Sequence, residues 1–134
     1  MTPYRILVTG WRHWPGEYAH VIHEALVRTA ALADPGRRPI IVVQGECEYG
    51  GVDLWANEWA VHTTDAEPEP HPAKRDSQGR ILGPARNARM VALGADVCLA
   101  FPGPGSRGTM DCIRKAKAAG IPTMIRHWHD VLKL

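Results

Sequence analysis

The apolar residues of this 134-residue chain alternate between short continuous runs and stretches with helical spacing. Continuous runs are typical of strands covered on both faces, and a spacing near 3.6 residues is typical of amphipathic helices. The pattern predicts strands at 5–9, 40–43, 96–101 and 123–126, with a weakly signalled strand near 67–71. It predicts helices at 17–33, after the glycine pair 50–51, at 84–93 and at 108–119.

This alternation of strands and helices indicates the α/β class. We expect one domain over residues 1–134, a three-layer Rossmann-like fold with a mainly parallel sheet of about five strands. Strands 5–9 and 96–101 should be neighbours. Ligands of such folds bind outside the carboxyl ends of the strands, so the crevice should lie between the ends of these two.

Composition excludes several classes of protein. Apolar residues make up 45% of the chain, but no run approaches the roughly 20 residues that span a bilayer. Sixteen basic and 14 acidic residues are too balanced to favour a nucleic acid partner. The first residues enter a strand at once, which predicts a cytoplasmic protein without a signal peptide. Cys47, Cys98 and Cys112 lack metal-ligand spacing and suit a reducing compartment, with Cys98 in the core.

The Gly-Pro-rich segment between the 96–101 strand and the next helix is the strongest functional signal. A glycine-rich turn that opens a helix directs backbone N–H groups to one point near the positive end of the helix dipole, which favours phosphate. Arg86, at the start of the preceding helix, would supply a countercharge. The predicted phosphate-binding residues of this loop are Gly103, Gly105, Ser106, Arg107, Gly108 and Thr109.

Two further loops follow the first and second strands, and each also has a purely structural interpretation. The first contains Gly10, Trp11, Arg12 and His13, and the second begins at Gly45 and leads to Asp53. The glycines suit tight strand-to-helix turns, and Asp53 suits a helix N-terminus. Because three such loops converge at one edge of a parallel sheet, a shared ligand site is the better interpretation of the group.

The aromatic and histidine residues divide between core and site. Trp55 and Trp59 share an apolar helix face and are predicted to be core. Trp11 and Trp14 either stack on a base or pack over the edge of the sheet. His127 and His129 should point apart in a strand and lie about 200° apart around a helix, so no metal site is predicted. We also expect no cofactor.

The irregular segment 64–82 contains three cations, Lys74, Arg75 and Arg80. Two interpretations remain open for them. They form a lid over an anionic ligand, or they belong to a solvated loop.

The chain resembles the SLOG superfamily, whose Rossmann-like members are related to the Lonely Guy enzymes and to DNA-processing protein A. The resemblance is strongest with the YspA-like, cpYpsA-related branch. It covers VTGWRHW (8–14), QGECEYGGVDLWANEWA (44–60), GPARNARMVALGADVCLAFPG (83–103) and GTMDCIRKAKAAGIPT (108–123). It implies a nucleotide-derived ligand, with phosphate on the Gly-Thr loop, and places Asn87 beside Arg86 in the site.

The chain departs from the Lonely Guy pattern where that family carries its catalytic glutamate. The family motif resembles P-G-G-x-G-T-x-x-E with an upstream arginine, which Arg86 matches. Cys112 occupies the glutamate position, and Asp111 precedes it. A thiol cannot replace a carboxylate beside a developing oxocarbenium ion, so an enzyme of this kind would depend on Arg86 and Asp111.

The sequence therefore leaves two functions open. The first is a module that binds a nucleotide or nucleotide-derived phosphorylated small molecule, as a sensor or by sequestering it. The alternative is a nucleotide N-glycosidase, a phosphoribohydrolase-like enzyme acting at the ribose of a nucleoside monophosphate. In either case Glu46, Glu48 and Asp53 are assigned to the sugar side of the ligand. Pairing into a homo-oligomer is left open.

Overall fold

A computed structural model describes residues 2–33, 37–46 and 50–132. Five strands and four longer helices alternate along them, with short helical turns before α1 and at the end. The strands are β1 (Tyr4–Gly10), β2 (Ile40–Gln44), β3 (Ala66–Pro70), β4 (Val97–Phe101) and β5 (Thr123–Ile125). The helices are η1 (Gly16–Tyr18, a 3-10 turn), α1 (Ala19–Ala31), α2 (Val52–Val61), α3 (Gly83–Ala92), α4 (Arg107–Ala118) and α5 (Trp128–Val131).

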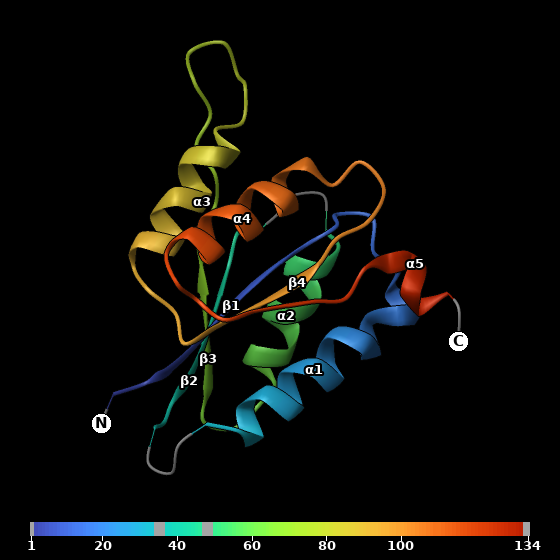
Figure 1. Ribbon diagram of the computed structural model, residues 1–134, viewed down its shortest axis with the longest axis vertical. Helices are drawn as coiled ribbons and strands as arrows, with labels where there is room; N and C mark the ends of the chain where they lie inside the picture. Colours follow the sequence, from blue (N-terminus) through green and yellow to red (C-terminus); the bar gives the residue numbers. More distant parts are fainter. Residues whose placement is uncertain (1, 34–36, 47–49, 133–134) are drawn as a thin grey trace.

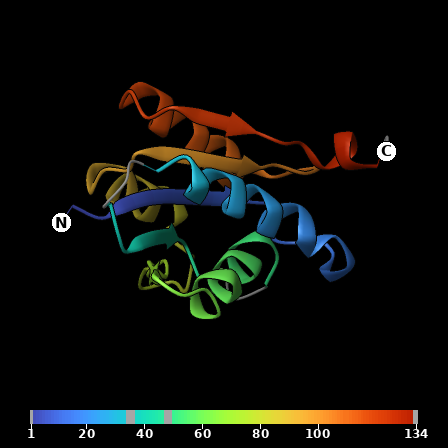
Figure 2. The same ribbon diagram turned by 90° about the horizontal axis from the view of Figure 1, so that it is seen from below.

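The five strands form one parallel sheet in the order β3-β2-β1-β4-β5. Figure 2 shows this order from red β5 past orange β4 and blue β1 to teal β2. The prediction that the first and fourth strands are neighbours is confirmed, with Gly10 paired to Phe101 at their carboxyl ends. The chain thus has the predicted α/β, Rossmann-like architecture.

Helices cover both faces of the sheet and complete the three layers (Figure 1). Ile6 and Val8 point toward α1 and α2, whereas Leu7 between them points toward α3 and α4. This alternation is the two-residue period of a strand. It explains why the consecutive residues Ile6, Leu7 and Val8 in the centre of β1 are all apolar, since both faces are covered there. Cys98 is fully buried on the α3 and α4 side, as predicted.

Two predicted element boundaries need correction. The first helix is regular only from Ala19, since residues 16–18 form a 3-10 turn behind Pro15. The weakly signalled third strand exists, but it covers Ala66–Pro70. Its sequence, AEPEP, is poor in strand formers because β3 is an edge strand, where proline is tolerated on the side that needs no N–H donor.

The order in which strands are added to the sheet reverses between β1 and β4. The chain adds β2 and β3 on one side of β1, and then adds β4 and β5 on the other side. The helix that follows β1 covers one face of the sheet, and the helix that follows β4 covers the other. The two loops therefore diverge at the carboxyl ends of adjacent strands and leave a crevice between them, the usual ligand position in open α/β sheets.

A charged cluster ties β1 to the edge strand on the α3 side. Arg5 donates from both terminal nitrogens to the Glu69 carboxylate, at 2.8 Å each, and from Nε to the Gly94 carbonyl at 2.9 Å. His71 Nε2 lies 2.8 Å from Glu69 Oε2. The hydrogen bonds from Arg5, with a further contribution from His71, lower the Glu69 pKa to about 2.

Because the folded-state pKa of Glu69 lies below its ordinary value near 4.5, its contribution to stability is complete above that pH. We predict that it is lost as the pH falls from about 4.5 to 2. Glu69→Gln should lower the free energy of unfolding at pH 7 by about 1–2 kcal/mol, since solvent screens this partly exposed pair, and should flatten the acid limb of the stability profile. Glu67→Gln, exposed on the same strand, is the control. Equal pH profiles for the wild type and Glu69→Gln in urea unfolding would contradict this.

Candidate functional site

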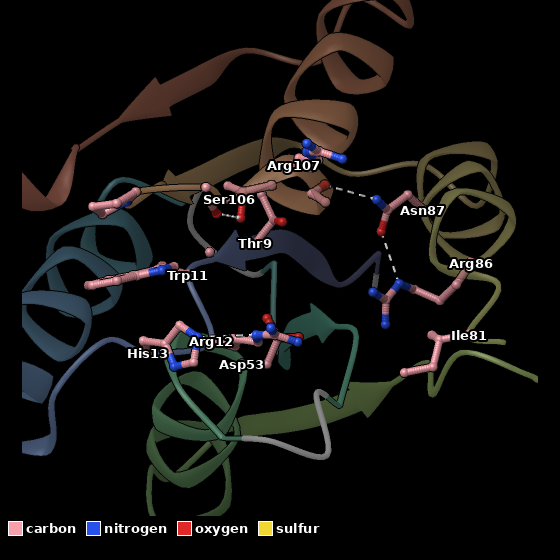
Figure 3. A pocket seen from close by; sticks show the side chains of 15 residues that line it. Thr9, Trp11, Arg12, His13, Asp53, Ile81, Arg86, Asn87, Ser106 and Arg107 are labelled. Carbon is pink, nitrogen blue, oxygen red and sulfur yellow. Dashed lines mark hydrogen bonds between the residues drawn. The ribbon is translucent and has the colours of Figure 1, made fainter. Parts of the chain in front are cut away.

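A cavity of about 450 Å³ occupies the predicted crevice at the carboxyl ends of β1 and β4. Figure 3 shows its walls, with Trp11 on one side, Arg86 and Asn87 opposite, and Ser106 and Arg107 along a third side. Twelve of the sequence-predicted residues line it: Gly10, Trp11, Arg12, His13, Asp53, Arg86, Asn87, Gly105, Ser106, Arg107, Gly108 and Thr109.

The first loop is held in place through the backbone of Trp11. Its N–H donates to the Phe101 carbonyl at 2.9 Å, and its carbonyl accepts from the Val52 N–H at 3.2 Å. The same loop passes so close to α2 that a β-carbon at Gly51, where φ is +77°, would clash with the Arg12 backbone. Glycine is therefore required at that position both for space and for conformation.

Arg86 connects α3 to the end of β2. Its Nη1 donates to the Gly45 carbonyl at 2.6 Å and, more weakly, to the His71 carbonyl at 3.4 Å. A β-carbon at Gly45 would clash with this nitrogen and would lie 3.1 Å from Asp53 Oδ2. Gly45 thus lies behind the cavity wall, and the Arg86 guanidinium and the Asp53 carboxylate lie beside each other in front of it.

Asn87 joins the two helices that face the cavity from the α3 side. Its side chain is 2% exposed. Its Oδ1 accepts from Arg86 Nε at 2.9 Å, and its Nδ2 donates to the Gly108 carbonyl at 3.1 Å. Asn87 therefore fixes the Arg86 side chain relative to the first turn of α4.

The amino end of α4 opens onto the cavity without a side-chain cap. Ser106, the residue before the helix, donates its hydroxyl to Thr109 Oγ1 at 2.5 Å and makes no capping bond to the backbone. The first N–H groups of a helix have no partners within it. Here they face a cavity in which Thr109 is 4% exposed and Arg107 is exposed, an arrangement that suits an anion.

Charge in the cavity is mainly positive. Among the described residues that line it, the arginines are Arg12, Arg86 and Arg107, and the carboxylate is Asp53, which is 8% exposed. Arg12 Nε lies 3.3 Å from His13 Nε2 (Figure 3). A buried carboxylate is retained where a cation or a hydrogen-bonding group stabilises its charge. The site thus has a positive rim and one negative position in its interior.

Asp111, the carboxylate on which an enzyme would depend, and Cys112, at the position of the family glutamate, lie outside this lining. Asp111 accepts from Lys115 Nζ at 2.7 Å and from Asn87 Nδ2 at 3.1 Å. Burial would raise the Asp111 pKa, but these hydrogen bonds outweigh burial and lower it. Cys112 is completely buried, and burial raises its thiol pKa to about 11. Asp111 is thus an ionised partner of α3, and Cys112 is a neutral core residue.

Three aromatic or acidic residues of the predicted loops have other positions. Trp14 is 2% exposed and packs edge-on against Phe101 and Trp128, which leaves sheet-edge packing as its role. Glu46 is exposed and does not line the cavity. Cys47 and Glu48 lie outside the described residues.

The expectation that His127 and His129 point apart is wrong. Their ring centroids are 3.9 Å apart. The reason is that His127 is the extended residue that caps α5, and its Nδ1 accepts from the His129 N–H. The pair therefore straddles a helix boundary rather than lying within one element. No group of three metal-binding side chains occurs in the described part of the chain.

The segment after β3 projects past the first turn of α3 (Figure 1). Arg80 forms an ion pair with Asp76 at 2.9 Å, and Arg75 donates to the Gly79 carbonyl at 2.7 Å, both within the segment. Of residues 71–82, all of them described, Ile81 is the one that lines the cavity. These contacts favour the solvated loop over the lid.

Three lining residues were not predicted: Thr9, Ile81 and Pro104. Thr9 ends the apolar run of the first strand, and its polar side chain there was an available signal. Pro104 lies inside the Gly-Pro segment that was recognised. No sequence pattern indicates Ile81, because its place beside the cavity depends on the course of the irregular segment.

Comparison with known proteins supplies a relative. No model of a known protein family matches the chain. The Gene 61 protein of Mycobacterium phage D29 is 38% identical over 127 residues, which cover 90% of this chain and 94% of the phage protein. The chain belongs to the family of this phage protein. The match spans nearly the whole length of both, so the family shares the domain and not only a motif. No helix in the described ranges is long and apolar enough to cross a membrane.

We predict that Gly103 controls the position of Trp11. A β-carbon at Gly103 would clash with the Trp11 ring, whereas one at Gly108 would meet no atom within 4 Å. Gly103→Ala should therefore cost about 1–3 kcal/mol of stability, as overpacking does, and should change the tryptophan emission. Gly108→Ala, in the first turn of α4, should change neither. The prediction fails if the two variants have equal unfolding midpoints and spectra.

Proposed function

We propose that this protein binds a nucleotide or a nucleotide-derived phosphorylated small molecule and acts as a sensor or by sequestering it. The observation that carries the proposal is the convergence of three arginines, the uncapped amino end of α4 and one buried carboxylate on a single cavity. A volume of about 450 Å³ lies within the range of small-molecule sites.

The phosphate of the ligand would bind at the amino end of α4. The backbone N–H groups near Gly108 and the hydroxyl of Thr109, which accepts from Ser106, offer donors, and Arg107 adds charge from the exposed side. Arg86 approaches from α3. Charge-assisted hydrogen bonds from arginine to phosphate are among the stronger polar contacts in proteins.

The sugar and base would occupy the part of the cavity bounded by the first two loops. Asp53 offers a carboxylate to ribose hydroxyls, a pairing common in dinucleotide folds. Trp11 is half-buried, and its ring contacts His13 at a centroid distance of 5.6 Å and Trp128 at 5.8 Å. It supports stacking of a base better than Trp14, which is buried. The resemblance to the SLOG superfamily, whose members bind nucleotide-type ligands, is consistent with this assignment.

Binding is favoured over hydrolysis because the carboxylate expected for catalysis faces another way. Asp111 is engaged by Lys115 and Asn87, and Cys112 is a buried thiol with a raised pKa. Neither lines the cavity. An N-glycosidase needs a carboxylate near the anomeric carbon of the ribose.

One observation favours the enzyme as a second candidate function. Asp53 is a carboxylate that does line the cavity, and it lies beside Arg86. If the protein cleaves the N-glycosidic bond of a nucleoside monophosphate, Asp53 and not Asp111 is the residue placed to stabilise the developing positive charge.

We predict that Arg86→Ala weakens binding of nucleoside monophosphates by about 1.5–3 kcal/mol, the range for a hydrogen bond to a charged group. Isothermal titration calorimetry measures the loss. Arg89→Ala, one turn later on the same helix and exposed, is the matched control and should bind as the wild type does. Arg107→Ala offers a second test that spares the Gly45 contact. Unchanged affinity in both folded variants, Arg86→Ala and Arg107→Ala, would refute the phosphate assignment.

We further predict little or no release of free base from AMP, GMP or N6-modified adenosine monophosphates over hours, followed by chromatography. Asp111→Asn should leave ligand binding intact, because Asp111 faces Lys115 and not the cavity. Base release that Asp53→Asn abolishes and Asp111→Asn preserves would establish the enzyme with Asp53 in the catalytic role. If Asp111→Asn abolishes the release instead, the catalytic carboxylate is Asp111, as the sequence suggested.

A further inference from the structure

A second hollow, of about 440 Å³, lies on the outer side of the loop that opens α4. Its walls include Arg107, Met110, Arg114 and His127, and it shares Gly105, Ser106 and Arg107 with the cavity described above. The loop is thus a common wall: one side faces the inner cavity, and the other faces this outer hollow.

Three of these side chains lie along one face of α4. Arg107, Met110 and Arg114 are spaced i, i+3, i+7, which places them in a row on the helix surface. With a rise of 1.5 Å per residue, the two arginines begin about 10 Å apart along the axis. A ligand that leaves the amino end of α4 along this face passes Arg107 first and Arg114 next.

Arg114 is only weakly held by the protein. Its side chain is 69% exposed, and its Nη2 lies 3.7 Å from Asp111 Oδ1. The same carboxylate is held more closely by Lys115 at 2.7 Å. The guanidinium can therefore turn toward a ligand without leaving Asp111 uncompensated.

His127 lines the same hollow and offers a donor. Its Nδ1 accepts from the His129 N–H, so the proton of a neutral ring lies on Nε2. The following residue, Trp128, donates its N–H to the Pro102 carbonyl at 2.8 Å, which fixes this segment to the loop. None of the described residues that line the outer hollow is acidic.

We propose that the outer hollow is a second phosphate subsite, and that the ligand is therefore of the nucleoside diphosphate class. This inference rests on the proposed function, which places the first phosphate at the amino end of α4. The second phosphoryl group would pass over the Gly105–Arg107 wall and bind Arg107, Arg114 and His127. Arg114 then determines specificity, because it lines the outer hollow and not the inner cavity.

The test compares nucleoside monophosphates with diphosphates of the four common bases by calorimetry at physiological salt. In the wild type, at least one diphosphate should bind about tenfold or more tightly than its monophosphate, the effect of a charge-assisted contact. Arg114→Ala should remove that preference and leave monophosphate affinity unchanged. Lys117→Ala removes the same charge from an exposed position of α4 outside both hollows, and it should preserve the preference.

The outcomes separate the two proposals. Equal affinities for the two ligand classes, or a preference that Arg114→Ala leaves intact, would overturn the second subsite while the proposed function stands. An equal loss in Lys117→Ala would overturn it too, since the effect would then be one of net charge. If neither class binds at all, both proposals fall together.

Discussion

The site depends on the two backbone hydrogen bonds of Trp11. One joins the first loop to the end of β4, and the other joins it to the start of α2. Parallel strands alone would only bring three loops to the same edge of the sheet. The Trp11 peptide holds two of them in contact, and the ring that it carries packs directly over Gly103 of the third. One residue therefore contacts the end of β4, the start of α2 and Gly103, and it sets their positions relative to one another around the cavity.

Much of the architecture could be predicted because the sequence pattern has a single physical cause. The continuous apolar runs of β1, β2 and β4 exist because helices cover both faces of those strands. The pattern fails for β3, where two prolines are compatible with an edge strand and no apolar face is required. It also fails at His127 and His129, since the periodic argument assumes one element and the pair spans the start of α5.

The part of the site that is formed by backbone groups could be predicted from the sequence. The glycines and the α4 end follow from the order of strand, turn and helix, so Gly105 to Thr109 could be placed from the sequence. The directions of the side chains could not be predicted from the sequence. Asp111 and Asp53 are both acids near a helix start, yet Asp111 faces Lys115 and Asp53 faces the cavity. That difference is set by how the helices pack and not by spacing along the chain.

The contact between Gly103 and Trp11 has a consequence for the evolution of this family. Since a β-carbon at position 103 and an indole at position 11 cannot share the same space, the two positions should covary. A relative with a larger residue at position 103 should carry a smaller side chain at position 11. Such a relative would lose the aromatic surface that we propose stacks on the base. Drift at a loop glycine would thereby change the aromatic surface of the cavity.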